Sequence, residues 1–174
     1  MNRTEHNNTS RGGSILPALC RIIGTALLLG VIILLIPMST PRLFGYDMYN
    51  VVSGSMEPAI PAGSMIFVQS AEAKELTEGE VIAFYSGGSV VVHRITNNNT
   101  VEGKISTKGD ANAEEDFTTV LYKEVIGVVK YHVPYLGDIS GNLTSSFGKV
   151  YLLALIILGL LFHLLAARLR TLLI

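Results

Sequence analysis

Two long apolar runs, one toward each end of the chain, most constrain how these 174 residues can fold. The first covers residues 15–36 with Arg21 as its only charge, and the second covers residues 150–167 with no formal charge. A helix needs about 20 consecutive, predominantly apolar residues to cross a bilayer. Each run approaches that length, so we predict one transmembrane helix at 15–37 and another at 150–167.

The charge-free part of the first run, residues 22–36, is by itself too short to span a bilayer. It becomes long enough when residues 16–19 are included and the Arg21 side chain extends to the interface. Pro37 is then expected to end the helix. A cleaved signal peptide is the alternative, but no clear small-residue cleavage site follows the run. We therefore favour a retained anchor.

The second run has the composition of a buried helix in a soluble core as well as that of a membrane span. Its terminal position and the Arg168 and Arg170 that follow it favour the span. His163 is its one ionisable side chain. Intramembrane ionisable groups are often functional, but near the end of the run we interpret His163 as a neutral interfacial residue.

Basic residues on the outer sides of the two runs predict the topology. These residues are Arg3, Arg11, Arg21, Arg168 and Arg170. The positive-inside rule places both chain ends in the cytoplasm. Residues 1–14 are polar without apolar periodicity and are predicted to be a disordered cytoplasmic tail, with residues 168–174 as the second tail. Residues 38–149 are then a domain outside the cytoplasm.

The segment between the runs has the pattern of a β-rich domain, in which short β-branched stretches alternate with turn residues. The predicted strands are 49–52, 64–68, 81–85, 90–96, 101–105 and, as one or two strands, 120–133. Turns are predicted at 86–89, 97–99 and 134–137, and surface loops at 71–80 and 108–115. The predicted fold class is mainly β: one β-rich domain flanked by an N-terminal and a C-terminal transmembrane helix.

Charge and cysteine content exclude other function classes. The formal net charge is −1, so no bulk electrostatic argument points to nucleic acid, and we expect no nucleic-acid partner. Cys20 is the only cysteine and lies within the first apolar run. It cannot form an internal disulfide, and a thiol among aliphatic side chains is a poor nucleophile.

A candidate for nucleophilic chemistry is the turn Ser53-Gly54-Ser55-Met56-Glu57-Pro58. Alone it is ordinary turn chemistry, and a serine hydroxyl needs a positioned base. His93 and His132 are the histidines of the predicted domain, and a lone histidine on a strand is more often structural. A histidine base works best when a carboxylate holds its second nitrogen. The acidic loop that follows offers Asp110, Glu114, Glu115 and Asp116, and spacing alone does not choose among them.

These motifs together resemble signal peptidase I. The matching stretches, in the family's motif order over about residues 40–137, are Ser53–Pro58, Gly79–Phe84, Val92-His93-Arg94-Ile95, Lys108-Gly109-Asp110 and Gly127–Gly137. Most bacterial members carry a lysine base where this chain has His93. The chain therefore resembles the endoplasmic-reticulum type, which is also found in archaea and some Gram-positive bacteria.

The resemblance implies that Ser55 is the nucleophile and His93 the general base. Asp110 and Asp116 match the family's acidic positions; we expect Asp116 to orient His93 and Asp110 to support the site. Ser53 matches the serine that helps bind the oxyanion in bacterial relatives, with the Ser55 backbone N–H as second donor. A Ser-Lys mechanism through Lys104 or Lys108 is disfavoured, because neither lysine occupies the position of the family's base.

By the same resemblance, we expect a membrane-bound serine endopeptidase that removes N-terminal signal peptides after small residues at −1 and −3. The expected partners are preprotein signal peptides and the lipid bilayer, and a translocon or other signal peptidase subunits stay open. We expect no cofactor and no metal. The membrane is either the plasma membrane of an archaeon or Gram-positive bacterium or the endoplasmic reticulum. The alternative is a non-catalytic, preprotein-binding subunit of the same fold, which would be expected to lose the serine, the histidine or the acidic loop.

Overall fold

The computed structural model describes residues 15–172 in two compact units. One unit combines the chain up to Pro37 with the chain from Leu143 onward, and the other comprises Met38–Asn142. The predicted tail at residues 1–14 and the last two residues of the tail at 168–174 lie outside the described residues.

The first unit is built from two long apolar helices, α1 (Ile15–Ser39) and α3 (Ser146–Leu172). Both are long and apolar enough to cross a membrane, with mean hydropathies of 2.7 and 2.6 over their most apolar windows. Only 17% and 11% of those windows are buried within the protein, which is far less than a soluble core helix requires. α1 continues two residues past Pro37, and α3 begins at Ser146, ahead of the apolar run that starts at residue 150.

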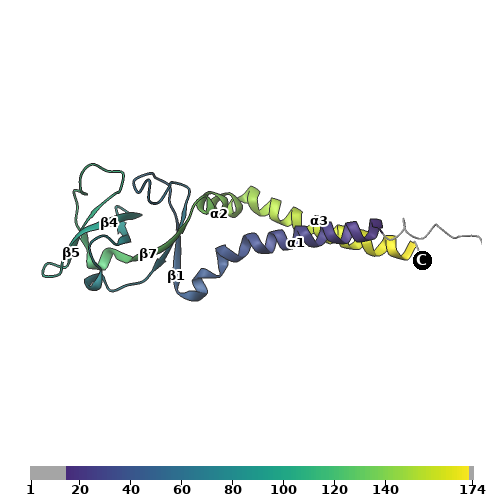
Figure 1. Cartoon of the computed structure of the whole chain (residues 1–174), viewed down its shortest axis with the longest axis horizontal. Helices are drawn as coiled ribbons and strands as arrows, with labels where there is room; N and C mark the ends of the chain where they lie inside the picture. The colour runs from purple at the N-terminus through teal and green to yellow at the C-terminus, as the bar shows by residue number, and fades with distance from the viewer. Residues whose placement is uncertain (1–14, 173–174) are drawn as a thin grey trace, which may run out of the picture. The chain divides into compact units, whose positions relative to one another are not determined.

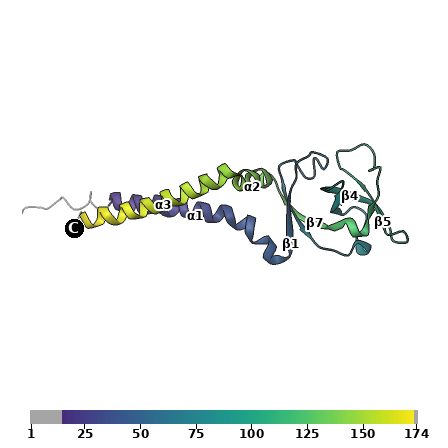
Figure 2. The ribbon, with the colours of Figure 1, turned by 180° about the vertical axis from the view of Figure 1, so that it is seen from behind.

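Two glycines bring α1 and α3 into contact around Gly24 and Gly159, whereas the helices separate elsewhere (Figures 1 and 2). A Cβ atom on Gly24 would lie 2.8 Å from the carbonyl oxygen of Gly159, and one on Gly159 would lie 2.9 Å from Leu28 Cγ. Glycines permit this approach because no side chain separates the backbones. Thr25 Oγ1 and His163 Nε2 are 3.3 Å apart across the same interface, so His163 has a polar partner on the other helix.

The second unit is organised around one seven-stranded antiparallel sheet (Figure 1). Its strands are β1 (Tyr46–Asn50), β2 (Met65–Gln69), β3 (Val81–Ser86), β4 (Ser89–Asn99), β5 (Lys104–Lys108), β6 (Val120–Leu121) and β7 (Val125–Val133). Their order across the sheet is β1-β2-β7-β3-β4-β5-β6. Four short helices accompany the sheet: η1 (Pro41–Phe44), η2 (Ala73–Glu75), η3 (Tyr122–Glu124) and α2 (Leu136–Thr144). The last of them, α2, begins in this unit and ends just after it. The predicted fold class, mainly β between two apolar helices, is confirmed.

Alternation along β3 divides the core between the two faces of the sheet. Ile82 and Phe84 belong to one hydrophobic cluster, whereas Ala83 belongs to a second cluster that also contains Met56 and Ile66. Successive side chains of a strand point to opposite faces, so one strand serves both clusters. Met56 is only 1% exposed, and its burial fixes the loop that carries the two serines.

Gly127 marks the point where β7 passes closest to the end of β2. A Cβ atom there would lie only 2.1 Å from the carbonyl oxygen of Gln69. β2 pairs with β7 and β7 with β3, each with a shift of register. The glycine in the family-like closing stretch therefore has a structural reason, which is backbone contact without room for a side chain.

Most predicted strands are confirmed, but the strand predicted at 101–105 runs over 104–108 after a turn at 101–103, and the one predicted at 49–52 runs over 46–50. The two-residue hairpin turn lies where the sequence indicates. Gly87 and Gly88 adopt φ values of 57° and 80°, the left-handed conformation that a tight hairpin needs. The short helix α2 was not predicted: the turn at 134–137 leads directly into it, after Tyr135 with φ of 63°.

The predicted turn at Asn97–Asn99 is wrong, because β4 continues through all three residues. The Asn98 side-chain amide donates hydrogen bonds to the carbonyl oxygens of Ala73 and Leu76, at 3.0 and 2.7 Å. Its Oδ1 accepts a bond of 2.7 Å from the Tyr122 hydroxyl. These partners are distant in sequence, so a pattern that is typical of a turn is satisfied by tertiary contacts instead.

Candidate active site

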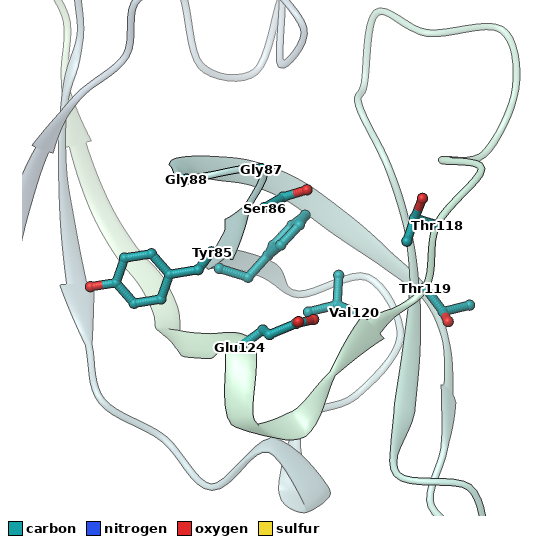
Figure 3. A pocket seen from close by; sticks show the side chains of 9 residues that line it. Tyr85, Ser86, Gly87, Gly88, Thr118, Thr119, Val120 and Glu124 are labelled. Carbon is teal, nitrogen blue, oxygen red and sulfur yellow. The ribbon is translucent and has the colours of Figure 1, made fainter.

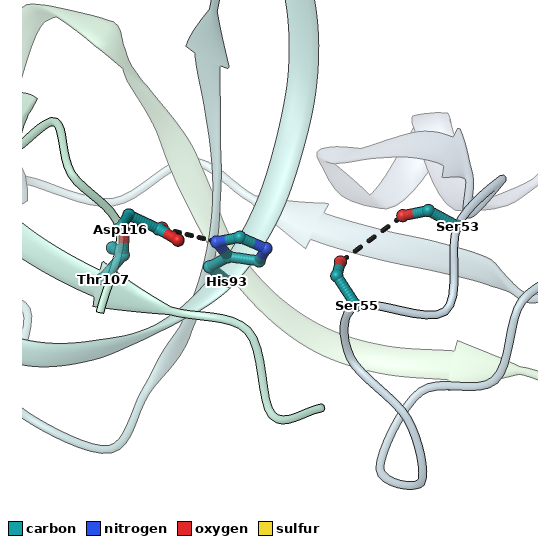
Figure 4. A network of polar contacts seen from close by, with 5 residues as sticks. All are labelled: Ser53, Ser55, His93, Thr107 and Asp116. Atoms are coloured by element: carbon teal, nitrogen blue, oxygen red, sulfur yellow. Dashed lines mark hydrogen bonds and ion pairs between the residues drawn. The ribbon is translucent and has the colours of Figure 1, made fainter. Parts of the chain in front are cut away.

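The loop between β1 and β2 carries Ser53 and Ser55. Its base is closed by backbone hydrogen bonds from Val51 N to Ser64 O and from Gly63 N to Val51 O, both 2.8 Å. Ser55 is half-buried beside the buried Met56, whereas Ser53 is exposed. The two hydroxyl oxygens lie 3.4 Å apart (Figure 4), which leaves both groups within reach of one bound atom.

His93 stands on β4 in the middle of the sheet, opposite Ile82 of β3. Its side chain is only 11% exposed. The edge of its ring meets Phe84, with ring centroids 6.4 Å apart and planes inclined by 67°. A histidine packed in this way on a central strand has little freedom to change its orientation.

Asp116 fixes the orientation of the His93 ring. His93 Nδ1 lies 2.5 Å from Asp116 Oδ2, and the same oxygen accepts a 2.6 Å hydrogen bond from Thr107 Oγ1. Thr107 is fully buried on β5, and its carbonyl oxygen accepts a 2.9 Å hydrogen bond from Asp116 N. An ionised carboxylate only accepts hydrogen bonds, so Nδ1 carries the proton and Nε2 of the neutral ring has a free lone pair.

Asp110 is bound to Arg94 rather than to His93. Arg94 Nε and Nη2 donate to the two carboxylate oxygens at 2.8 and 2.6 Å, and Nη1 donates to Gly79 O at 2.8 Å. The Arg94 hydrogen bonds lower the pKa of Asp110, and the nearby His93 contributes a smaller effect in the same direction. Asp110 therefore connects the acidic loop to β4 next to His93 and stays ionised.

Gly109 and Ala111 bring the acidic loop against the serine loop. Ala111 N donates a 2.9 Å hydrogen bond to the backbone carbonyl of Ser55. A Cβ atom on Gly109 would lie 2.6 Å from the same carbonyl oxygen and 3.0 Å from His93 Nε2. Gly109 thus lies between Ser55 and His93, and only glycine fits there. In Figure 4 the second ring nitrogen of His93 faces the serine loop, with no hydrogen bond drawn between Ser55 and His93.

The two lysines weighed as alternative bases have other partners. Lys108 Nζ donates to Ala113 O, and Lys104 Nζ pairs with Glu102 Oε2, each at 3.0 Å. His132, on β7 opposite Ile66, is exposed. Thr107, Arg94 and Gly109 were not singled out from the sequence. Gly109 and Arg94 lie inside the family-like motifs, so only their position beside His93 and Asp110 could have indicated them.

Comparison with known proteins identifies the family of the chain that carries this site. A family model described as Peptidase S24-like matches residues 44–129. The chain is 42% identical over 85 residues to signal peptidase I W of Bacillus subtilis, an alignment that spans 46% of this chain and 44% of the Bacillus protein. It is 32% identical over 120 residues to the signal peptidase complex catalytic subunit SEC11 of Candida tropicalis, which spans 60% of this chain and 72% of that subunit. This chain belongs to the signal peptidase family.

A further relative, SEC11 of Yarrowia lipolytica, is 34% identical over 102 residues, covering 52% of this chain and 59% of its own. The residues matched by the family model include both serines of the β1–β2 loop, His93, Asp110 and Asp116. All of the candidate site in this signal peptidase family member therefore lies within the region that the family model matches.

Proposed function

We propose that this protein is a membrane-bound serine endopeptidase that removes N-terminal signal peptides from secreted or membrane preproteins. The observation that carries the proposal is the buried His93, held at Nδ1 by Asp116 with Nε2 facing the loop of Ser55. A histidine in this state can accept a serine proton without changing its orientation. Family membership supports the choice of substrate, and small residues at −1 and −3 follow from the resemblance.

In the proposed mechanism, Ser55 Oγ attacks the carbonyl carbon before the scissile bond while His93 Nε2 takes its proton. Asp116 stabilises the imidazolium that forms, and Thr107 keeps the carboxylate in place. His93 then gives the proton to the leaving nitrogen, which produces an acyl-enzyme on Ser55. A water molecule, activated by the same histidine, releases the signal peptide.

Negative charge develops on the carbonyl oxygen during the attack. The proposed donors to it are the Ser53 hydroxyl and the Ser55 backbone N–H. The 3.4 Å separation of the two hydroxyl oxygens supports this assignment, because a donor and the nucleophile must converge on the same carbonyl group. Asp110 acts indirectly, by holding Arg94 and the loop next to His93.

A cavity of about 360 Å³ beside Ser55 supports binding of the signal peptide in extended form. It lies between residues 49–52 on one side and residues 89–92 on the other, and its lining mixes valines with polar, uncharged residues such as Asn50 and Ser89. An extended peptide can bind between such segments through main-chain hydrogen bonds, with alternate side chains in shallow pockets. None of the described residues that line it carries a formal charge, which suits the small, uncharged residues expected before the scissile bond.

The proposed localisation has the β-rich domain outside the cytoplasm, between spans α1 and α3, as the Lys/Arg bias predicts. The membrane is the plasma membrane of an archaeon or Gram-positive bacterium or the endoplasmic reticulum. A non-catalytic subunit of the same fold is not favoured, because the serine, the histidine and the acidic loop are all present and His93 has a carboxylate partner. A translocon or further signal peptidase subunits are compatible partners.

The test is cleavage of one preprotein by the purified full-length chain in detergent, with the new N-terminus identified by mass spectrometry. Ser55→Ala is expected to lower kcat by about 10⁶, since residues that act as a unit fail together. Ser70→Ala, on an exposed serine outside the site, is the matched control and should cleave normally. If the Ser55→Ala protein still cleaves the preprotein, Ser55 is not the nucleophile and the proposed peptidase site is wrong.

A further inference from the structure

A second cavity, of about 580 Å³, opens beside His93. One wall comes from the sheet through Phe84, Val91 and His93, and the other comes from the acidic loop through residues 112–118. Ser55 lines the cavity described above and not this one, whereas Val91 lines both. Ser55 therefore lines one cavity and His93 the other, and the two cavities adjoin at Val91 of β4.

The chemistry of acyl transfer determines which of the two cavities each part of the substrate occupies. The part of the substrate before the scissile bond stays attached to Ser55 Oγ as the acyl group. The part after the bond leaves through its nitrogen, which takes its proton from His93 Nε2. The leaving polypeptide must consequently pass the histidine, and the cavity beside His93 lies on its path.

We infer that this cavity binds the first residues of the mature chain, and that its side chains set a preference there that is separate from the signal-peptide cavity. The inference rests on the proposed function, because it needs an acyl transfer at Ser55. An extended chain advances about 3.3 Å per residue, so the residues at +2 to +4 cover about 10 Å beyond the bond. The cavity is large enough for such a segment.

A further cavity of about 360 Å³ continues the path, and it shares Phe84, Ser86 and Thr118 with the cavity beside His93. Figure 3 shows Tyr85 of β3 and Thr118 of the acidic loop on opposite sides of this opening. Gly87 and Gly88 of the hairpin also line it. The two cavities thus adjoin between the β3–β4 hairpin and the loop that precedes β6, on the expected path of the leaving polypeptide.

The charges along this path have one sign. Glu114 and Glu115 line the cavity, are exposed and have no ion-pair partner among residues 15–172. Within the described chain, no Lys or Arg lines either cavity on this path. Lys108 is the nearest cation along the loop, and its ammonium group is held by Ala113 O. A basic residue shortly after the cleavage site is therefore favoured, and an acidic residue is repelled.

Phe117 adds an apolar contact on the same path. Its side chain is 102% exposed although it is a large aromatic on an ordered loop, and it lines the cavity beside His93. An exposed aromatic ring at a cavity gains free energy when a bound segment covers it. Phe117 is thus expected to contribute affinity for the mature chain whatever its charge.

The test uses preproteins that are identical through the +1 residue and carry Lys, Ser or Glu at +2 to +4. For the full-length wild-type chain, kcat/KM is expected to be about tenfold higher with Lys than with Glu. The Glu114→Gln/Glu115→Gln double variant should bring the three substrates to within about twofold of one another. The matched control, Glu72→Gln/Glu75→Gln, removes two exposed carboxylates that line neither cavity and should keep the wild-type order.

Phe117→Ala separates the aromatic contact from the charge effect. It is expected to lower kcat/KM about fivefold for the Ser substrate, and to leave unchanged the cleavage of a substrate truncated after +1. If the wild type cleaves all substrates with no charge preference, or if the double glutamine variant keeps the preference, the inference is overturned and the peptidase function stands. If the wild type cleaves none of them, the proposed function fails and takes this inference with it.

Discussion

A single carboxylate oxygen, Asp116 Oδ2, decides how His93 is presented. It accepts from both His93 Nδ1 and Thr107 Oγ1, and Thr107 is fully buried. The hydroxyl that holds the carboxylate is itself immobile, so the ring, the carboxylate and the hydroxyl form one rigid set. The lone pair on Nε2 is directed toward the serine loop before any substrate binds.

Asp116→Asn is therefore expected to lower kcat by about 10⁴ with little change in KM, because the amide stabilises the wrong tautomer and does not stabilise the imidazolium. Single-turnover cleavage of a preprotein measures the effect, and circular dichroism checks that the fold is kept. Asp47→Asn, on an exposed aspartate of β1, is the control and should retain the wild-type rate. A rate within tenfold of wild type for Asp116→Asn would contradict this role.

The contact between Asp110 and Arg94 leads to a different prediction, which concerns how the stability of the folded protein depends on pH. Hydrogen bonds from Arg94 lower the pKa of Asp110, so the ionised carboxylate stabilises the fold at pH values above the ordinary Asp pKa of about 3.9. That contribution is lost as the pH falls through the lowered pKa of the folded protein. Arg94 is 37% exposed, and solvent screening limits the contribution to about 1 kcal/mol.

Thermal unfolding of the full chain in detergent measures this contribution. At about pH 6, Asp110→Asn should be less stable than wild type by about 1 kcal/mol, and the difference should shrink as the pH falls below about 4. An effect of constant size between these pH values would show that Asp110 acts through packing and not through its charge.

Among the elements, the acidic loop between β5 and β6 is the one that joins the serine loop to the histidine. Ala111 N binds Ser55 O, Asp116 binds His93, and Gly109 passes between them. The loop thus sets the spacing between the serine loop, which joins β1 to β2 at one edge of the sheet, and His93 on the inner strand β4. Its backbone contributes to the site as much as its carboxylates do.

Gly109→Ala is expected to lower kcat/KM at least about 100-fold, because the added Cβ would push apart Ser55 and His93 and misplace the reacting groups. Preprotein cleavage provides the measurement. Gly141→Ala is the matched control: its Cβ would meet only Asn50 Nδ2 at an ordinary 3.8 Å, within helix α2. Equal activity of the two variants would show that the approach at Gly109 is not needed.

Local patterns along the chain were sufficient for the elements that depend on local chemistry. The alternation at 81–85 predicts β3, and Gly87 and Gly88 predict the hairpin, since both rest on residues close in sequence. The turn predicted at residues 97–99 was wrong, because the hydrogen-bond partners of the Asn98 side chain lie 22 to 25 residues away in the sequence. The contact of His93 with Asp116 spans 23 residues, and only the family resemblance pointed to Asp116 among four carboxylates.

For the whole molecule, the apolar runs predicted two membrane-competent helices around a β-rich domain, and this architecture is confirmed. The orientation of the domain stays a prediction from the Lys/Arg bias. The chain has a single cysteine, Cys20, which is buried. Replacing it gives a background in which one introduced thiol reports the side of the membrane.

In a Cys20→Ser background, Val101→Cys places a thiol at a position that is 95% exposed in the β-rich domain, and Thr171→Cys places one at the end of α3. For a plasma-membrane protein, an impermeant maleimide added to intact cells should label position 101, and position 171 only after permeabilisation. For an endoplasmic-reticulum protein, the outer face of sealed microsomes is cytoplasmic, so position 171 should be labelled at once and position 101 only after permeabilisation. The opposite order in the membrane used would place the domain in the cytoplasm and overturn the proposed localisation.

The close approach of Gly24 and Gly159 has a consequence for the order of synthesis. The two glycines are 135 residues apart (159 minus 24), so α1 has no partner until the whole β-rich domain and most of α3 have been made. At about 5–20 residues per second, translation alone keeps α1 waiting for about 7–27 seconds. In the proposed topology, the apolar length of α1 alone holds it in the bilayer during that interval, and His163 can contact Thr25 only after α3 has been made. In that topology, export of the domain is thus completed before the two-helix anchor is complete.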